Sequence, residues 1–213
     1  MTSAGAIAGC TAQTLLVSRT AAALANYDAS QQFPAVSDNG IVVFNTSADN
    51  LIADPVPGAS ASGVLLDSQL PSISADGRFI GFPAQGENSS VGLLATPPLN
   101  LQLPGGQAML FDSCVIAAGN VARCTPHFAY ASVLDSGNLD ITLAAQANLQ
   151  PSLSDDGRFI WFALPYNLAP AYQGGTAVYV RDACGGASAP PSCVPHTALV
   201  SVDASGVQAG SVG

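Results

Sequence analysis

One short phrase occurs three times in the chain and constrains its fold more than any other feature. The two full copies, residues 71–82 and 151–162, share the pattern Pro-x-x-Ser-x-Asp-Gly-Arg-Phe-Ile-x-Phe. A worn copy at residues 34–44 keeps the proline, the serine and the glycine but lacks the arginine. Internal similarity of this kind indicates that one supersecondary unit is stacked several times along the chain.

Each copy of the phrase predicts a β-hairpin. A short apolar run ends in serine, and Asp-Gly or Asn-Gly then precedes a second apolar run. These dipeptides favour two-residue hairpin turns, because such turns need positive φ. We therefore expect residues 71–74 and 79–82 to be adjacent antiparallel strands. The second strand is apolar on both faces, which is typical of a sheet covered on both sides. The predicted turn residues are Asn39, Gly40, Asp76, Gly77, Asp156 and Gly157.

A second repeated phrase contains the cysteines. Segments 10–18, 124–132 and 193–201 each begin with cysteine and end with serine, and residues 112–114 and 182–184 share Asp-x-Cys. Each pair of phrases predicts a strand, a loop with a cysteine at either end, and a returning strand. The complete unit then has four antiparallel strands, two beside the Asp-Gly turn and two beside the cysteine loop.

Four antiparallel strands per repeat form the blade of a β-propeller. The Pro-x-x-Ser-x-Asp-Gly-Arg-x-Ile-x-Phe pattern resembles the blade signature of TolB-like propellers, a WD-like repeat of periplasmic and cell-surface bacterial proteins. The cysteine loop resembles a version found in repetitive secreted bacterial proteins. The resemblance implies an all-β fold, a β-propeller fragment of about three antiparallel four-stranded blades in an open arc.

The repeats divide the chain into four parts. Residues 1–33 hold the outer strand and linker of a truncated preceding blade, and residues 34–70 form a short degenerate blade without a cysteine loop. Residues 71–150 form a blade with a long insertion between its second and third strands, and residues 151–213 form the last blade. We expect the repeats at both ends of the chain to be incomplete parts of a longer array of repeats. The unpaired Cys10 could also belong to a lipobox-like segment, but no charged start or sufficient apolar stretch precedes it.

Composition supports an all-β chain and excludes several partners. Apolar residues make up 48% and charged residues only 9%, and turn-forming residues interrupt every apolar run. The net charge of −9 and the absence of lysine argue against nucleic acid and against anionic membrane surfaces. No apolar stretch approaches the ~20 residues of a membrane-spanning helix.

The remaining cysteines predict disulfides. The expected pairs are Cys114–Cys124 and Cys184–Cys193. Each would close a loop of about ten residues, contribute roughly 2–3 kcal/mol and imply an oxidising compartment, the periplasm or the exterior. The alternative is a metal site, because His127 and His196 follow Cys124 and Cys193 at Cys-x-x-His spacing. We favour disulfides, since the two histidines lie in separate units and no carboxylate partner is evident.

The sequence predicts no catalytic residue, cofactor or metal. His127 and His196 are the only histidines and occupy equivalent repeat positions, which favours a structural role. The chain has no Gly-x-Ser-x-Gly elbow, and a phosphate-binding loop of the Gly-Lys type needs a lysine that it lacks. Asp155 and Asp156 resemble a carboxylate pair, but Asp156 is the expected turn residue.

The function expected from the resemblance is a non-enzymatic propeller scaffold that binds a protein or a surface ligand and belongs to a longer repeat protein. The alternative is the propeller domain of a larger hydrolase or peptidase whose catalytic domain lies outside this chain. An open arc leaves apolar blade faces uncovered, so we expect contact with further blades or self-association. The insertion at residues 83–107 is the candidate site for another partner, and the alternative is a flexible loop without a binding role. A β-sandwich is the alternative fold.

Overall fold

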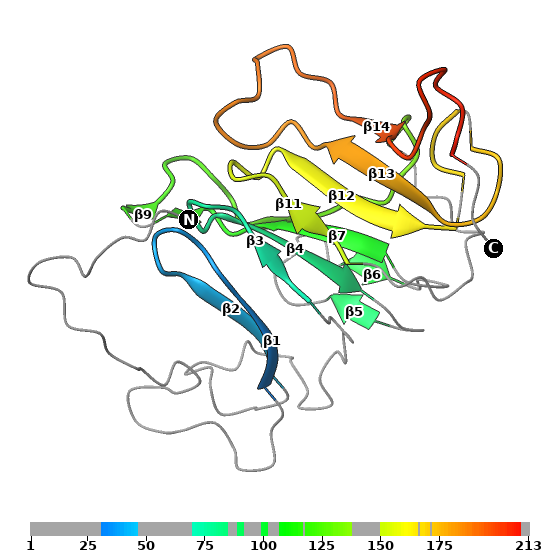
Figure 1. The fold of residues 1–213 in the computed structure, drawn as a ribbon. Coiled ribbons are helices and arrows are strands. Elements are labelled where there is room, and N and C mark those ends of the chain that lie inside the picture. The colour runs from blue at the N-terminus through cyan, green and yellow to red at the C-terminus, as the bar shows by residue number, and fades with distance from the viewer. Residues whose placement is uncertain are drawn as a thin grey trace, which may run out of the picture.

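The computed structural model is all-β throughout the residues that it describes, and no helix occurs among them (Figure 1). No membrane-spanning helix is found in that part of the chain. The structure describes residues 31–46, 70–84, 89–91, 99–101, 107–116, 118–137, 150–165, 167–170 and 172–209.

The first four-stranded sheet is built from the repeat that begins at Pro71. Its strands are β3 (Ser72–Ile73), β4 (Phe79–Ala84), β7 (Gln107–Asp112) and β10 (His127–Tyr130). The strands pair in the order β3-β4-β7-β10, and every pair is antiparallel. The four strands therefore follow the order predicted from the turn phrase and the cysteine phrase.

The second four-stranded sheet repeats this arrangement. Its strands are β11 (Ser152–Leu153), β12 (Phe159–Leu164), β13 (Ala177–Asp182) and β14 (His196–Leu199), paired antiparallel in that order. The register is also the same in both sheets. Phe79 pairs with Asp112 as Phe159 pairs with Asp182.

The worn copy of the phrase forms a two-stranded hairpin. β1 (Gln31–Val36) pairs antiparallel with β2 (Val42–Thr46), and the register shifts between Gln32 and Ala35, around Pro34. A proline has no amide hydrogen for the ladder, so an irregularity is expected there. β1 begins before the expected boundary at residue 34. The remaining strands of that predicted blade, and Cys10, lie outside the described residues.

Two further hairpins lie within connections of the first repeat. The long insertion contains β5 (Ser89–Val91) paired with β6 (Leu99–Leu101), and the cysteine loop contains β8 (Val115–Ile116) paired with β9 (Gly119–Asn120). The insertion predicted as a loop thus includes regular structure. Ala84 and Gln107 are register partners at its base, so the insertion leaves and re-enters the sheet at adjacent positions.

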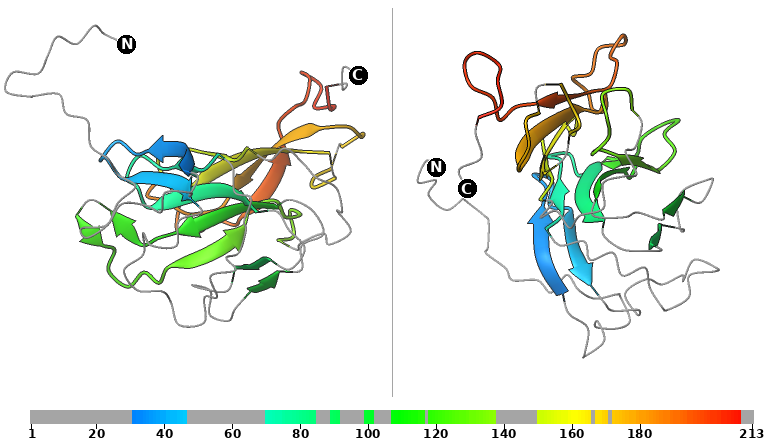
Figure 2. Two further views of the ribbon diagram at one scale, coloured as in Figure 1. Left: turned by 90° about the horizontal axis from the view of Figure 1, so that it is seen from below. Right: turned by 90° about the vertical axis from the view of Figure 1, so that its right-hand side faces the viewer.

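The two four-stranded sheets lie against each other, as Figure 2 shows from two further directions. The second sheet contributes large side chains to the core between them, including Ile160, Phe162 and Tyr179, while the first contributes Ala108 and Ala131. A side chain added at Gly81 would touch Ile160. Small residues facing large ones let the sheets interdigitate at the density of a protein interior.

The expectation that the second strand of each hairpin is covered on both faces holds for only one of the two sheets. In β4, Phe79 and Phe82 point to opposite faces and both are buried. In β12, Phe162 is buried but Trp161, on the opposite face, is 39% exposed. The second sheet therefore has one apolar face without a neighbouring sheet among the described residues.

Candidate functional site

The repeated phrase folds into a turn held by its serine and aspartate side chains. The Ser74 hydroxyl donates to Asp76 Oδ1 at 2.6 Å and accepts from the amide of Phe79 at 2.9 Å. The amide of Arg78 also donates to Asp76 Oδ1, at 3.0 Å. These bonds satisfy the backbone groups that the turn leaves unpaired, which explains why serine and aspartate occur at this spacing.

The prediction of a two-residue turn is wrong. Ser74 donates its amide hydrogen to the carbonyl of Phe79, and the amide of Gly77 donates to the carbonyl of Ser74, so four residues separate the paired ends of the strands. Only the glycine has positive φ, at 77°. A two-residue turn of the Asn-Gly type needs positive φ at both central residues, whereas this turn lets the aspartate remain at negative φ and bind the backbone with its side chain.

The same turn recurs in the other copies of the phrase. Ser154 Oγ donates to Asp156 Oδ1 at 2.7 Å and accepts from the Phe159 amide at 3.0 Å. In the worn copy, the Ser37 hydroxyl accepts from the amide of Ile41 at 2.9 Å. The glycines of both turns, Gly157 and Gly40, have positive φ.

The three turns form a row joined by backbone hydrogen bonds. The amide of Asp38 donates to the carbonyl of Ala75 at 3.1 Å, and the amide of Ala75 donates to the carbonyl of Asp155 at 2.7 Å. Asp38, Ala75 and Asp155 hold the same position in the three copies of the phrase. Each repeat therefore binds the next through one equivalent contact, and we call this arrangement the turn row.

A second contact recurs along the turn row. A side chain added at Gly77 would overlap Ile41, and one added at Gly157 would overlap Phe79. Ile41 and Phe79 are equivalent, because each is the first residue after its turn. The apolar residue that follows one turn thus packs on the glycine of the next turn, which requires a residue without a Cβ there.

An arginine and an aspartate connect each turn to its cysteine loop. Arg78 donates to Asp112 from Nε at 2.8 Å and from Nη2 at 2.7 Å. Arg158 binds Asp182 in the same way, with its shortest bond, from Nη2 to Oδ2, at 2.6 Å. Arginine and carboxylate groups match in this two-point geometry, which fixes orientation as well as charge.

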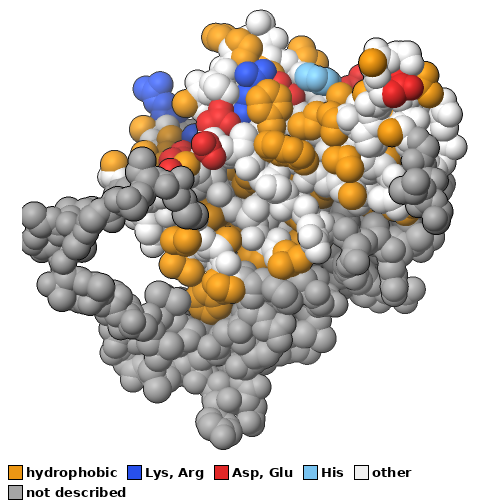
Figure 3. Space-filling model, viewed as in Figure 1, with side chains coloured by type: hydrophobic (Ala, Val, Ile, Leu, Met, Phe, Trp, Pro, Cys, Tyr) orange, Lys and Arg blue, Asp and Glu red, His pale blue; other side chains and the backbone are white. Residues whose placement is uncertain are grey.

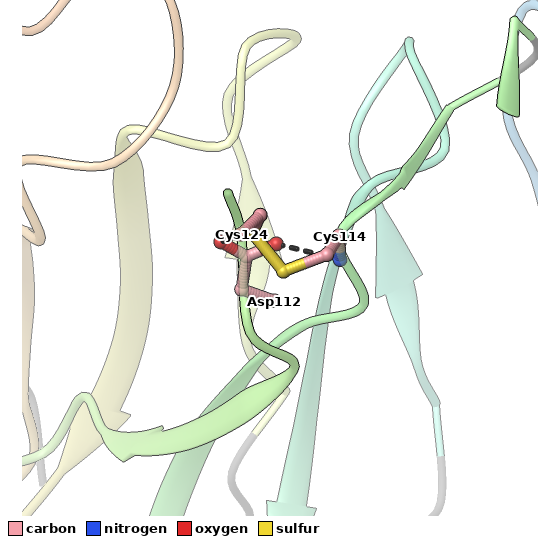
Figure 4. A group of neighbouring side chains, drawn as sticks. All are labelled: Asp112, Cys114 and Cys124. Carbon is pink, nitrogen blue, oxygen red and sulfur yellow. Dashed lines mark hydrogen bonds between the residues drawn. A yellow bond between two sulfur atoms is a disulfide. The ribbon is translucent and has the colours of Figure 1, made fainter. Parts of the chain in front are cut away.

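Each aspartate lies beside a disulfide, as Figure 4 shows for the first sheet. The cysteines paired from the sequence lie at disulfide distance, with Cα atoms 5.5 Å apart for Cys114–Cys124 and 5.6 Å apart for Cys184–Cys193. The amide of Cys114 donates to Asp112 Oδ1 at 2.9 Å. The carboxylate therefore links the arginine of the turn to the first cysteine of the loop.

Both aspartates have pKa values below the ordinary value for a carboxyl group. Burial opposes this for Asp112, but the hydrogen bonds from Arg78 and from the amide of Cys114 outweigh it and lower the pKa. For Asp182 the hydrogen bond from Arg158 is the largest cause of the lower pKa. The two carboxylates are therefore held in the charged form by the groups around them.

The structure also bears on the alternative of a metal site. Asp112 and Asp182 bring a carboxylate to each cysteine pair, with ligand atoms within 4.8 Å of one another, although the sequence showed no evident carboxylate partner. Neither histidine joins these two clusters among the described residues. In the disulfide form the sulfur atoms offer no thiolate, which is the ligand that zinc needs from cysteine. In each cluster the carboxylate and the disulfide together join the turn to the cysteine loop.

Asp155 and Asp156 make different contacts in and beside the turn. Asp156 accepts hydrogen bonds from Ser154, from the amide of Arg158 and from Ser188, and burial only partly offsets the lowering of its pKa by these bonds. Asp155 is exposed and takes part in the turn row through its carbonyl oxygen. Both residues serve the backbone of the turn.

The arginine–aspartate pairs were not predicted, although the sequence contained a signal for them. Asp-x-Cys follows only the two phrases that contain arginine, and the worn copy lacks both features. The joint presence and joint absence of the two residue types within one chain is what a direct contact produces.

No protein-family model, curated protein or solved structure matches the chain.

Proposed function

We propose that this chain is part of a TolB-like β-propeller scaffold, in which the two four-stranded sheets are blades and the β1–β2 hairpin belongs to a third. The turn row carries the proposal. In a propeller, equivalent strands of successive blades lie around one axis, and equivalent residues of successive repeats should then make one repeated contact. Asp38, Ala75 and Asp155 make such a contact.

Disulfides suggest an oxidising environment, and we infer that the scaffold acts in the periplasm or outside a bacterial cell. Cysteine pairs that close short loops persist where thiols are not kept reduced. Each pair here also sits on an aspartate held by arginine, so the loop is fixed at two points. Rigid loops on a stable sheet are suited to presenting a binding surface.

The proposed activity is binding of a protein or a surface ligand without catalysis. The insertion that contains β5 and β6 is the proposed contact region. It leaves the sheet at Ala84 and re-enters it at Gln107, so the sheet does not need it to pair its strands. Long insertions with regular structure of their own on a rigid scaffold are commonly binding elements.

One variant tests the binding role. Replacing residues 85–106 by Asn-Gly joins two register partners through a two-residue hairpin turn and should leave the sheet folded, as measured by circular dichroism and thermal melting. The native chain and the variant are applied to arrays of bacterial surface glycans and secreted proteins. We expect saturable binding by the native chain and a loss of at least ~10-fold in affinity for the variant.

The exposed residue Val194 gives a control, since Val194→Asp adds a charge outside the insertion. Its binding should equal that of the native chain. Binding that survives removal of the insertion, or no binding at all, contradicts the proposed activity. An experimental structure in which the two four-stranded sheets do not fan around the turn row contradicts the propeller itself.

A further inference from the structure

The outer face of the second four-stranded sheet carries an apolar patch. Hydrophobic side chains gather over β12 and β13 in Figure 3. Six apolar residues form a patch on this face, which we call the tail face: Trp161, Ala163, Val178, Val180, Ala198 and Val200. Trp161, Val178 and Val200 are exposed. The register also places Ser152, Phe159, Asp182 and His196 on this face, nearer the turn and the cysteine loop, so the six apolar residues form a patch beside polar ones.

The equivalent face of the first sheet is covered by the next repeat. Gly81 stands where the second sheet has Trp161, and Ala108 and Ala131 stand where it has Val178 and Val200. Ala108 and Ala131 belong to the core beneath the second sheet, and Gly81 faces Ile160. The chain therefore shows what covers this face of a repeat: the inner face of another repeat.

The residue that follows the turn is less buried at this end. Phe79 packs under the turn of the second sheet and is only 3% exposed. Its equivalent, Phe159, is not fully buried. The contact that would complete the pattern is a turn glycine placed over the Phe159 ring.

The opposite end of the stack has a matching turn. A side chain added at Gly40 would meet no described atom within 4 Å, whereas one at Gly77 or Gly157 would overlap the preceding repeat. Val36 is 67% exposed, and its equivalent Leu153 packs into the core between the sheets and faces Gly81. We call Val36 and Gly40 the head face. It carries the features that cover a repeat elsewhere in the chain. Within the described residues, Val36 is mostly exposed and the space beside Gly40 is open.

We propose that a second copy of this chain docks head to tail, with its head face on the tail face of the first. The proposal rests on the propeller scaffold proposed above. Val36 of the second copy packs near Trp161, and its Gly40 lies over Phe159. The amide of Asp155 donates to the carbonyl of Asp38 of the second copy, which continues the turn row by one step. Contacts between unlike faces close into a ring when the rotation permits, and two copies with about three repeats each fall within the four to eight blades of known propellers.

Two single substitutions test the docking. Trp161→Asp places a charge on the tail face and Val36→Asp places one on the head face. Both residues are exposed within one chain, so the fold should persist, and circular dichroism checks this. Sedimentation equilibrium of the native chain should give twice the 21.3 kDa mass of one chain. Each variant alone should raise the dissociation constant at least ~10-fold, because each buries an unpaired charge.

A mixture of the two variants separates head-to-tail docking from symmetric docking. Each variant keeps one intact face, so the mixture should recover a particle of two chains that neither variant forms alone at the same concentration. Val194→Asp adds a charge at an exposed valine that belongs to neither face as defined above, and it should associate like the native chain. If Val36→Asp associates normally while Trp161→Asp does not, two tail faces pair with each other and the proposal is wrong.

A monomeric native chain at all concentrations also overturns the docking. If such a monomer still binds a glycan or protein of the arrays, and loses that binding when the insertion is removed, the scaffold function stands and only the docking fails. If the sheets do not fan around the turn row in an experimental structure, both proposals fail together. The two measurements therefore distinguish the two failures.

Discussion

Arg78 holds the carboxylate of Asp112 with two hydrogen bonds of 2.8 and 2.7 Å, and the side chain of Asp112 is only 7% exposed. Arg78 lies at the end of the turn, and Asp112 is the last residue of β7. The same pair recurs at Arg158 and Asp182. In both sheets the contact joins the turn row to a disulfide-closed loop. Its loss should therefore destabilise both the turn and the loop.

Replacing Arg78 with lysine should destabilise the chain. Lysine keeps the positive charge but cannot donate two parallel hydrogen bonds to one carboxylate. We expect a loss of about 1–3 kcal/mol in the free energy of unfolding, measured by urea denaturation. The control is Arg123→Lys, because Arg123 is exposed, and its effect should stay within ~0.5 kcal/mol. Equal effects of the two substitutions on the free energy of unfolding would show that the two-point contact does not stabilise the chain more than an exposed arginine does.

Stability should fall on acidification. The pKa of Asp112 is lower in the folded chain than the ordinary value of 3.8, and that of Asp182 is lowered as well. The unfolded chain therefore binds more protons in this range, and the free energy of unfolding rises with pH. The contribution is present above the ordinary value and is lost as pH falls below it, through the lower pKa values of the folded chain. Urea unfolding across this range should show a shallower pH dependence for Asp112→Asn, and an unchanged slope contradicts the assignment.

The two disulfides should contribute similar amounts. They close loops with sequence separations of 10 and 9 residues, for which loop-closure entropy predicts about 2–3 kcal/mol each. The double substitutions Cys114→Ala with Cys124→Ala, and Cys184→Ala with Cys193→Ala, should each lower the free energy of unfolding by that amount. Cys10→Ala is the control, since it leaves both pairs intact. A loss confined to one pair contradicts the equivalence of the two loops.

The pattern of the sequence was sufficient for the strands of the two four-stranded sheets and their order, but not for the β5–β6 and β8–β9 hairpins within the connections. The Asp-Gly phrase marks the junction of β3 and β4, and the cysteine phrases mark the ends of β7 and the starts of β10. These signals are local, because a turn and its flanking apolar runs are adjacent in the chain. The type of turn was missed, since the side-chain bonds of Ser74 and Asp76 favour a longer turn in which only Gly77 has positive φ.

The contacts between distant residues were harder to predict. Asp112 and Arg78 are separated by 34 residues, and nothing in the spacing of either phrase sets that distance. Their pairing follows from strand register, which places Phe79 opposite Asp112. The turn row was likewise invisible in the sequence, because it uses backbone groups that every residue carries. Only the repeated position of Asp38, Ala75 and Asp155 distinguishes these contacts.

The turn glycines should differ in their tolerance of alanine. Gly157 and Gly40 both have positive φ, at 74° and 84°, so alanine at either position costs about 1–2 kcal/mol of backbone strain. At Gly157 the added carbon would also overlap Phe79, whereas at Gly40 it meets no described atom within 4 Å. Gly157→Ala should therefore lower the melting temperature more than Gly40→Ala does. In a chain of this length each further 1 kcal/mol of lost stability lowers the melting temperature by about 2–4 °C. Equal melting temperatures would mean that Phe79 moves aside freely, and that the close contact between successive repeats along the turn row is not what holds them together.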